Sequence, residues 1–329
     1  MGRVPVIKTV NLCKYYEMGK NVVKALDHIN FEVYSGELII IFGPSGCGKS
    51  TLMHLIAGLD EPTSGEIYIR GEKLSGKNAK ELAQHRRTKI GLVFQQFNLI
   101  NTMNIIENVA LPLAFNRISK RRRFKRAETL IEAIGLSSQK NHTPSELSGG
   151  QQQKLAIARA LVANPWILLA DEPTGNIDSR SADEVIKLLV ILSRKSKRTI
   201  LIITHNPDYL KYADRLIYLK DGKIIKIRLN RRVKGIGEEA QEWLPSLKAT
   251  IYEEEKRRKE EKGASSKGSL ASKGQLSWPK RKKPLLPSED FEKARLDSRL
   301  GSTESRRESK QPSSEEESPE GINLIEPKI

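Results

Sequence analysis

The hydrophobic pattern of the chain contains four short runs in which Ile, Leu and Val are continuous rather than alternating. They read ELIIIFG, KIGLVFQ, WILLAD and TILIITH, at residues 37–43, 89–95, 166–171 and 199–205. Continuous runs of this length are typical of strands buried on both faces of a mainly parallel sheet. Helical periodicity lies between them, at about 49–59, 120–135, 150–164 and 180–196. The alternation predicts an α/β fold.

Other stretches have shorter apolar segments broken by turn residues. Residues 4–16, 22–36 and 64–75 predict short strands of an antiparallel layer. The segment RLIYLKDGKIIKI, at 215–227, predicts a hairpin with Asp221 and Gly222 at its turn. This hairpin would close the folded domain.

The apolar pattern ends near residue 228, so we expect one domain over residues 1–228. Residues 229–262 predict a charged, partly helical extension, because Glu253 to Glu255 lie four positions before Arg257 to Lys259. That spacing favours a solvated helix, and a partner-binding helix is the alternative. Residues 263–329 are rich in Lys, Glu, Ser and Pro, which predicts a disordered tail.

The chain is strongly basic, with a net charge of +17. Basic and acidic residues are nearly balanced after residue 230, so most of the excess lies on the folded domain. A basic domain could face nucleic acid, an anionic membrane surface or the phosphates of a nucleotide. Seven basic residues between Arg117 and Arg126 favour a solvated helix face, with lipid headgroups as the alternative.

Cysteine content and hydropathy narrow the class of protein. Two cysteines, Cys13 and Cys47, exclude a disulfide framework and suit a reducing cytosol. No run approaches the roughly 18 apolar residues of a membrane-spanning helix, and the first residues lack the apolar core of a signal peptide. The sequence therefore predicts a soluble, cytoplasmic protein.

The segment GPSGCGKST follows the first continuous apolar run and matches the phosphate-binding pattern G-x-x-x-x-G-K-[ST]. Its glycines let backbone N–H groups turn toward phosphate oxygens, and the following helix adds its positive end. A strand, glycine loop and helix in this order predict a three-layer P-loop nucleotide-binding core. We expect Lys49 to reach the β and γ phosphates and Ser50 to ligate Mg²⁺.

The ATP-binding residues expected here are Gly43, Pro44, Ser45, Gly46, Cys47, Gly48, Lys49, Ser50 and Thr51. Helix-end N–H groups are also expected to lower the pKa of the Cys47 thiol.

A pair of carboxylates ends the run WILLAD. A buried strand delivers Asp171 and Glu172 to the carboxyl edge of the sheet, where the phosphate loop also lies. We expect Asp171 to hold the Mg²⁺ shell through water, and Glu172 to act as the general base on the attacking water. A solvated acidic pair at a strand end is the alternative.

The motif LSGGQQQ, at 147–153, completes a set with GPSGCGKST, LLADEPTGNIDS and the Thr-His pair at 204–205. Together these motifs resemble the ATP-binding-cassette (ABC) ATPases over residues 1–228, with a helical signature subdomain. The segments VFQQFNLI, ENVALPL and DEPTGNIDS are most similar to the branch that contains LolD, MacB and FtsE. The resemblance implies that Tyr16 stacks on adenine, that Gln95 touches Mg²⁺ and water, and that His205 contacts the γ-phosphate.

The resemblance also implies a dimer. Two copies would pack head to tail, and the signature residues of one copy would close the ATP of the other: Ser148, Gly149, Gly150 and Gln151, together with Asp178. A glycine-lined helix start offers free N–H groups and a positive dipole end. An ordinary helix start capped by Ser148 is the alternative, although it leaves the paired glycines unexplained.

The predicted function is ATP hydrolysis coupled to a separate membrane permease of the lipoprotein-release or MacB-like exporter type. The resemblance implies that the permease docks near residues 97–105, from Phe97 to Ile105, and holds the chain on the cytoplasmic face of the membrane. Ordinary helical core is the alternative for that segment. Nucleic-acid partners are not expected, because DNA-linked members insert long coiled coils between the phosphate loop and LSGG. A soluble ABC ATPase of a scaffold or cell-division assembly stays open.

Overall fold

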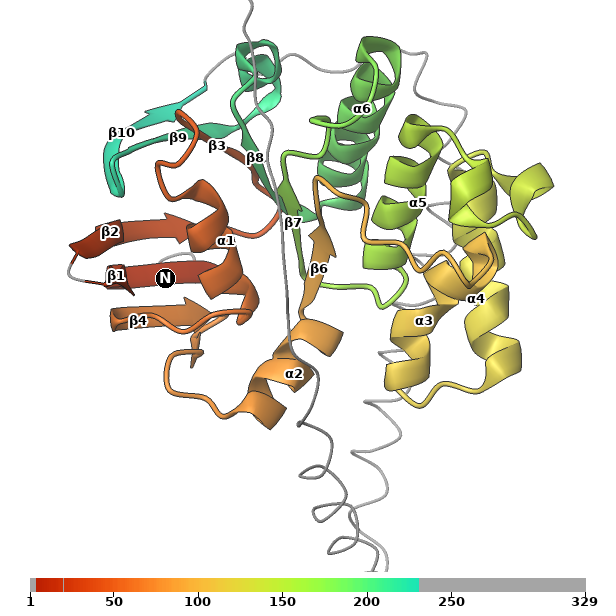
Figure 1. Ribbon diagram of the computed structural model, residues 1–329, viewed down its shortest axis with the longest axis horizontal. Helices are drawn as coiled ribbons and strands as arrows, with labels where there is room; N and C mark the ends of the chain where they lie inside the picture. Colours follow the sequence, from red (N-terminus) through yellow and green to blue (C-terminus); the bar gives the residue numbers. More distant parts are fainter. Residues whose placement is uncertain (1–3, 20, 231–329) are drawn as a thin grey trace, which may run out of the picture. The chain divides into compact units, whose positions relative to one another are not determined.

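The continuous apolar runs form four neighbouring strands of a six-stranded sheet in the computed structural model, which describes residues 4–19 and 21–230 (Figure 1). The strand order is β10-β9-β3-β8-β7-β6. Neighbouring strands are parallel from β9 to β6, and β10 runs antiparallel to β9. The strands are β3 (Leu38–Phe42), β6 (Ile90–Val93), β7 (Ile167–Asp171), β8 (Thr199–Thr204), β9 (Arg215–Lys220) and β10 (Lys223–Leu229).

The strands β3, β7 and β8 are buried on both faces of this sheet, as their sequences predict. Successive side chains of a strand point to opposite faces. Leu38 and Ile40 belong to one hydrophobic cluster, whereas Ile39 and Ile41 belong to a second one. All four side chains are at most 1% exposed. The strand that leads into the phosphate loop is therefore held from both sides.

The second cluster lies between the six-stranded sheet and a smaller antiparallel sheet. That sheet has the order β2-β1-β4-β5 and consists of β1 (Ile7–Met18), β2 (Asn21–Val33), β4 (Ser64–Ile69) and β5 (Glu72–Lys73). Helix α1 (Lys49–Ala57) packs Leu52, Met53 and Ile56 into the same cluster. The antiparallel layer predicted from the turn-rich stretches is confirmed.

The first cluster lies against the helices on the other face of the six-stranded sheet. They are α3 (Ile105–Phe115), α4 (Lys120–Ala133), α5 (Gly149–Leu161) and α6 (Ser179–Ser196). Three short 3-10 helices, Ser137–Gln139, Pro144–Glu146 and Pro207–Tyr212, join the larger elements. Figure 1 shows α1 and the antiparallel strands on one side of the molecule and α3 to α5 on the other. The predicted three-layer arrangement is confirmed.

Two helices, α2 (Ala79–Thr88) and α3, lie outside the four ranges predicted from helical periodicity, and α2 also lacks an apolar pattern. Helix α2 is mostly polar and buries only Leu82 and His85. A capping box starts it, because the Asn78 side chain accepts from the N–H of Glu81 while the Glu81 carboxylate accepts from the N–H of Asn78. The sequence carries this Asn-x-x-Glu signal although it lacks the periodicity.

The hairpin that closes the domain forms as predicted. Asp221 and Gly222 link β9 to β10 with φ angles of 47° and 73°. Two successive positive φ values are those of a type I′ turn, whose twist matches that of the flanking strands. Strand β10 ends at Leu229, while residues 231–262 of the predicted extension and the predicted tail (263–329) lie outside the described residues.

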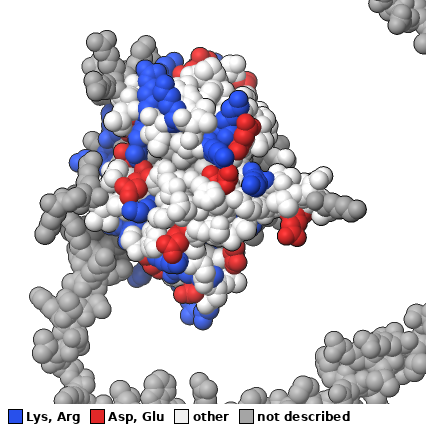
Figure 2. All heavy atoms as spheres, turned by 90° about the vertical axis from the view of Figure 1, so that its left-hand side faces the viewer, with Lys and Arg blue, Asp and Glu red and all other residues white. Residues whose placement is uncertain are grey.

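Basic and acidic side chains interleave on the face at the left of Figure 1, with uncharged surface between them (Figure 2). Lys73 pairs with Glu66, and Lys8 pairs with Glu32 at 2.9 Å. The net positive charge is therefore not gathered into one patch on this face. None of the helices among the described residues combines the length and apolar character that a bilayer span requires.

Candidate functional site

The phosphate loop lies in the turn between β3 and α1, and close packing explains two of its glycines. A Cβ at Gly43 would lie 2.1 Å from the carbonyl oxygen of Leu219. A Cβ at Gly48 would lie 2.2 Å from the carbonyl oxygen of Ala25, and Gly48 also has a φ of 102°. Only glycine fits at either position, so the hairpin and β2 together shape the loop.

The Lys49 side chain lies inside this loop. It is 5% exposed, and its ammonium donates to the carbonyl oxygens of Gly43 at 2.9 Å and Pro44 at 2.8 Å. These are ordinary hydrogen bonds of a charged donor, and they hold the ammonium at the loop. A cation held there complements a polyphosphate.

Asp171 ends β7 next to the start of α1. Burial raises the pKa of its carboxyl, while a hydrogen bond from Ser50 opposes that shift. Its Oδ1 atom is buried and has no hydrogen-bond partner among the described residues. An orphaned carboxylate oxygen beside a serine hydroxyl fits the oxygen ligands that Mg²⁺ or its bound water requires.

Glu172 follows in a strained backbone conformation. Its φ is 43°, which is rare for a residue with a side chain, and its N–H donates to the carbonyl oxygen of Ile203 on β8. The turn directs its carboxylate to His205, with 3.2 Å between Oε1 and Nδ1. A cavity of about 510 Å³ opens beside both side chains, and Thr174, Asn206 and Asp208 also line it. Strain of this kind gathers at functional sites.

Gln95 follows β6 and lies against the loop after Glu172. Its backbone carbonyl accepts from the side-chain amide of Asn176 at 3.1 Å, and its own amide donates to Asn176 at 3.4 Å. A Cβ at Gly175 would lie 2.7 Å from the Gln95 amide nitrogen, so a side chain there would displace the Gln95 amide. The structure thus brings Gln95 to the segment that carries the two carboxylates.

Tyr16 lies near the end of β1 beside Thr51 of α1, with 39% of its surface exposed. Its hydroxyl donates to Asp60 at 2.9 Å, and Lys14 pairs with the same carboxylate at 2.7 Å. The Lys14 ammonium also lies 5.0 Å from the centre of the Tyr16 ring. The ring is therefore tethered at its hydroxyl end while much of its surface stays open.

The signature segment starts α5. Ser148 caps this helix, because its hydroxyl accepts from the N–H of Gln151 while the Gln151 side chain accepts from the N–H of Ser148. A Cβ at Gly150 would lie 2.3 Å from the Ser181 hydroxyl on α6, and one at Gly149 would lie 3.2 Å from Ile177. Packing against Ser181 therefore explains why residue 150 is glycine, and the sequence alone did not reveal this contact.

Asp178 caps the next helix. Its side chain accepts from the N–H of Ser181 at 3.0 Å, and this bond lowers the pKa of the Asp178 carboxyl. The start of α5 and the start of α6 are thereby held against each other through Ser181. The signature residues and Asp178 form one surface.

The signature residues and Asp178 lie on the other side of the six-stranded sheet from the phosphate loop of the same chain. Helix α1 packs into the cluster on one face of the six-stranded sheet, and α5 packs into the cluster on the other face. Figure 1 shows the two helices on either side of the strands. The structure thus collects the expected residues into two groups rather than one.

Comparison with known proteins identifies the family. The model of the ABC transporter family matches residues 26–175. The ABC transporter ATP-binding protein MJ1508 of Methanocaldococcus jannaschii is 47% identical over 222 residues, which cover 68% of this chain and 99% of that protein. The chain belongs to the ABC transporter ATP-binding proteins. As an ABC ATPase it binds ATP with Mg²⁺ and hydrolyses it.

Two further comparisons place this ABC cassette beside more specific relatives. The dimeric post-hydrolysis structure of the ATP-binding cassette MJ0796, bound to ADP and Pi, is 42% identical with a TM-score of 0.64, and the match covers 70% of this chain and 100% of that one. The macrolide export ATP-binding/permease protein MacB of Chlorobaculum tepidum is 42% identical over 68% of this chain and 34% of that protein. The predicted α/β cassette fold is shared with the MJ0796 cassette.

The expectation for Cys47 of this ABC cassette was wrong. Its side chain is 4% exposed, and burial raises the pKa of the thiol above its usual value. The nearby Lys49 ammonium and backbone N–H groups act in the lowering direction, as the sequence suggested, but burial outweighs them. Burial of the loop under neighbouring strands was not visible in the motif.

Three partners of the ABC motifs were missed in the sequence. Asp60 and Lys14 hold Tyr16, and Asn176 holds Gln95. Asn176 lies 81 positions from Gln95, and Asp60 lies 44 positions from Tyr16. No spacing rule in the sequence predicts the contact of Asp60 with Tyr16 or of Asn176 with Gln95. Only the fold brings these residues together.

Proposed function

We propose that two copies of this chain close around two ATP molecules and drive a separate membrane permease. The observation that carries the proposal is the placement of the phosphate loop and the signature surface on opposite faces of one sheet. An ATP touched by both must lie between two chains. The solved relative MJ0796 is dimeric, which supports this arrangement.

The phosphate-loop side of each copy would take one nucleotide. Backbone N–H groups and the Lys49 ammonium would bind the phosphates, and Tyr16 would stack on the base. Ser50, Gln95 and Asp171 would hold Mg²⁺, with Asp171 acting through water. Bound there, Mg²⁺ would neutralise charge on the β and γ phosphates. The full set contributed by this side is Tyr16, Gly43, Pro44, Ser45, Gly46, Cys47, Gly48, Lys49, Ser50 and Thr51.

Hydrolysis would begin at Glu172. Its carboxylate would take a proton from the attacking water, whose oxygen bonds to the γ-phosphorus while the bond to the bridging oxygen breaks. ADP and inorganic phosphate are then the products. His205 lies 3.2 Å from Glu172 and would contact the γ-phosphate, and Gln95 would orient the water. Glu172, His205 and Gln95 are thus the proposed catalytic residues.

The second copy would close the far side of the γ-phosphate. Ser148, Gly149, Gly150 and Gln151 would offer the positive start of α5, and Asp178 would lie beside them. Shifting a pair of copies from mostly open to mostly closed needs about 5.5 kcal/mol of differential binding. Hydrogen bonds to charged groups contribute about 1.5–3 kcal/mol each, so a few at each of two sites suffice. Loss of the γ-phosphate would therefore open the pair.

The permease would dock in a groove that lies between α2, β6 and α3. The groove has a volume of about 350 Å³. Its lining combines apolar side chains such as Leu92, Phe94 and Phe115 with the cationic side chains of Arg86, Arg87 and Arg159. Phe115 is 60% exposed and adjoins the other apolar side chains of the groove, and contiguous exposed apolar surface often marks a binding site. A short helix with an apolar face and an acidic end would fit this surface.

This groove refines the docking segment expected at residues 97–105. Asn98 lines the groove, and Ile100 is 36% exposed. Ile105, in contrast, starts α3 and is fully buried in the helical core. The proposed docking surface therefore includes the first residues of segment 97–105, whereas Ile105 at its end belongs to the hydrophobic core.

The permease would be of the lipoprotein-release or MacB type. The chain spans about a third of the Chlorobaculum MacB, whose name includes both an ATP-binding and a permease part. The permease part would here come from another chain and would hold this ATPase on the cytoplasmic face of the membrane. The opening and closing of the pair would then move the permease.

Size-exclusion chromatography with light scattering tests the proposal. Glu172→Gln keeps the size of the side chain but removes the base, so this variant is expected to form a stable dimer with unhydrolysed ATP and Mg²⁺. Adding Ser148→Arg places a bulky cation on the signature surface and is expected to abolish that dimer. The matched control Ser138→Arg, on an exposed short helix outside α5, is expected to leave the dimer intact.

Three results would contradict the proposal in whole or in part. A Glu172→Gln chain that binds ATP and stays monomeric, even with a detergent-solubilised permease of the MacB type, rules out the closed pair. A dimer that survives Ser148→Arg shows that the signature surface is not part of it. A dimer that forms with ATP but never binds the permease would support the closed pair and contradict the transport role.

A further inference from the structure

The two long strands of the antiparallel sheet contain an irregularity whose side chains take no part in the proposed hydrolysis. Leu12 of β1 pairs with Ile29 of β2, and Lys14 pairs with Leu26. Between these pairs, the single residue Cys13 stands opposite two residues, Asp27 and His28. This two-against-one arrangement is a β-bulge.

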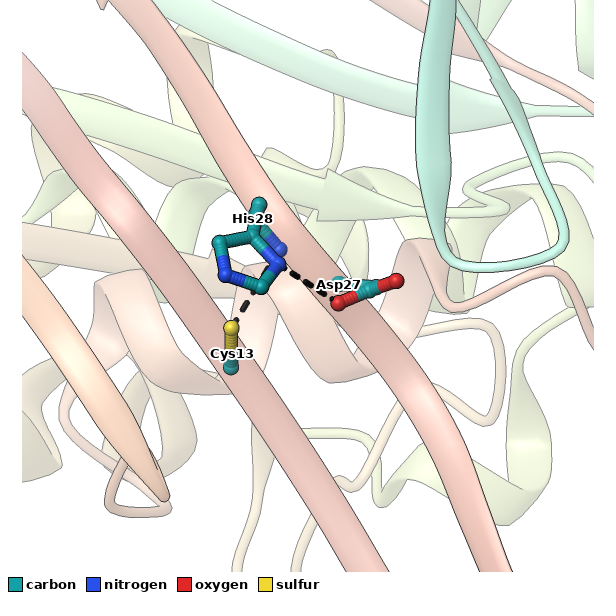
Figure 3. A group of neighbouring side chains, drawn as sticks. All are labelled: Cys13, Asp27 and His28. Atoms are coloured by element: carbon teal, nitrogen blue, oxygen red, sulfur yellow. Dashed lines mark hydrogen bonds and ion pairs between the residues drawn. The ribbon is translucent and has the colours of Figure 1, made fainter.

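The bulge brings together side chains that a regular strand would separate. Neighbouring residues of a strand point to opposite faces, but His28 has a φ of 55°. That conformation is strained for histidine, and it turns the imidazole to the side of the sheet where Asp27 lies. Figure 3 shows the side chains of Cys13, Asp27 and His28 facing one another across the two strands.

The contacts within this group are short. His28 Nδ1 lies 2.7 Å from Asp27 Oδ1, and the backbone N–H of His28 donates to the Cys13 sulfur at 3.3 Å. One sulfur, one ring nitrogen and one carboxylate oxygen lie within 4.8 Å of one another. Among the described residues, no other three side chains of these kinds meet this condition.

We propose that Cys13, Asp27 and His28 bind one divalent transition-metal ion of the zinc class. Sulfur, imidazole nitrogen and carboxylate oxygen are the three ligand types that zinc takes in proteins, whereas Mg²⁺ and Ca²⁺ select oxygen alone. Three protein ligands leave a fourth position for water. Small rotations of Asp27 and His28 would open their direct contact to the separation that two ligands of one ion require.

The environment of each ligand suits this role. Cys13 is 2% exposed. Burial raises the pKa of its thiol, but hydrogen bonds from the His28 N–H and from neighbouring side chains outweigh burial and lower it. The thiolate is the form that binds metal. The His28 side chain is 68% exposed, so an ion can reach the group from solvent.

One cation already lies beside the group. Lys223 of β10 is 3.2 Å from Asp27 Oδ2, and the Tyr15 hydroxyl donates to Asp27 Oδ1 at 3.0 Å. The Lys223 side chain is 63% exposed, so its ammonium can move into water when an ion takes its place. The Tyr15 hydroxyl bond can stay and hold the carboxylate, as hydrogen bonds to metal ligands commonly do.

The position of the group ties it to the nucleotide side of the molecule. The Asp27 N–H donates to the Gly222 carbonyl at 2.8 Å, and the Gly222 N–H donates to the carbonyl of Cys47 in the phosphate loop at 3.1 Å. An ion that braces Asp27 therefore braces the turn beneath the loop. Binding to the folded chain alone also raises the temperature of thermal unfolding.

Zinc titration of the full-length chain tests the proposal. Excess Mg²⁺ and ADP are kept present, so that Ser50 and Asp171 are occupied, and Zn²⁺ binding is followed by calorimetry. We expect one ion per chain, and Co²⁺ in its place should give the absorption of a cobalt–thiolate bond. Cys13→Ser and His28→Asn should each weaken Zn²⁺ binding on the order of a hundredfold or more.

The variants are chosen to preserve the fold. Ser has nearly the size of Cys, and Asn tolerates the positive φ at position 28. Unchanged ADP affinity in each variant shows that it has folded. The matched control is His142→Asn, an exposed histidine away from the bulge, which should bind Zn²⁺ as the unmodified chain does.

Three results would overturn the site. One is the absence of Zn²⁺ binding, or of the cobalt–thiolate absorption, in the unmodified chain. Another is unchanged affinity in both Cys13→Ser and His28→Asn. The third is an equal loss of affinity in His142→Asn, because this would place the ion elsewhere.

Discussion

At the scale of single residues, Cys47 shows how burial can reverse the effect of a helix start on a thiol. Positive ends of helices lower the pKa of cysteines that water can reach. Here the sulfur is enclosed by the loop and lies 4.0 Å from the Lys49 ammonium, and loss of hydration still raises its pKa. The chemical reactivity of the loop therefore follows from its packing.

We predict slow alkylation of Cys47. Because its pKa is raised, less thiolate is present at neutral pH than in a free cysteine, and the rate with iodoacetamide should be lower and should still rise above pH 9. Mass spectrometry of the peptide that carries Cys47, with a short cysteine peptide as the reference, measures this rate. Alkylation as fast as that of the reference at pH 7 would contradict the raised pKa.

The residues of the site divide into those that the sequence could reveal and those that it could not. Lys49, Asp171 and Glu172 lie in contiguous motifs whose chemistry requires them next to one another, so they could be predicted. Asp60 and Asn176 act through contacts that only the folded chain creates. A sequence motif reflects local geometry, whereas the residues that hold the motif in place can lie far from it in the sequence.

At the scale of elements, the contact of α5 with α6 depends on a glycine. The backbone of Gly150 lies so close to Ser181 that a Cβ would be 2.5 Å from the Ser181 Cβ. The two glycines of the signature segment are therefore not explained by the same contact. Gly150 lets the two helices approach, and Gly149 is less crowded.

We predict that Gly150→Ala destabilises the chain by about 1–3 kcal/mol, the usual effect of overpacking. Gly149→Ala is the matched control and should change the free energy of unfolding by a few tenths of that or less, since only the Ile177 side chain must move. Urea unfolding without nucleotide measures both. Adding Ser181→Gly should recover part of the loss, and equal effects of the two alanine variants would show that the contact is not the cause.

Predictability at this scale follows from where apolar residues lie. The strands β3, β7 and β8 are buried on both faces, so their sequences are unmistakable runs. Helix α2 packs with only two buried side chains, and its capping box was its one signal. Elements that contribute little to a core leave little trace in the hydrophobic pattern.

At the scale of the whole molecule, one buried histidine makes stability depend on pH. His85 of α2 is 3% exposed and lies 3.2 Å from the carbonyl oxygen of Ile56. Burial is the main cause that lowers its pKa to about 4. The folded chain keeps His85 neutral, whereas the unfolded chain protonates it below about pH 6.5.

We predict that stability falls as the pH drops from about 6.5 to about 4, because only the unfolded state gains this proton in that range. The full effect is on the order of 3 kcal/mol. Below about pH 4 both states carry the proton, and His85 causes no further loss. His85→Gln cannot take up the proton, so its urea unfolding curves should shift less than those of the unmodified chain between pH 7 and 4.5. Equal shifts would show that other groups cause the loss.

The order of strands in the six-stranded sheet also has a consequence in time. The strand β3, which leads into the phosphate loop, pairs with β8 and β9, and neither exists until residues 199–220 have been synthesised. The loop itself packs on Leu219 and bonds to Gly222. At about 5–20 residues per second, a ribosome needs on the order of ten seconds to bridge that gap. A growing chain thus carries its phosphate-binding sequence long before it can bind a nucleotide, and the last hairpin sets the moment at which it becomes able to.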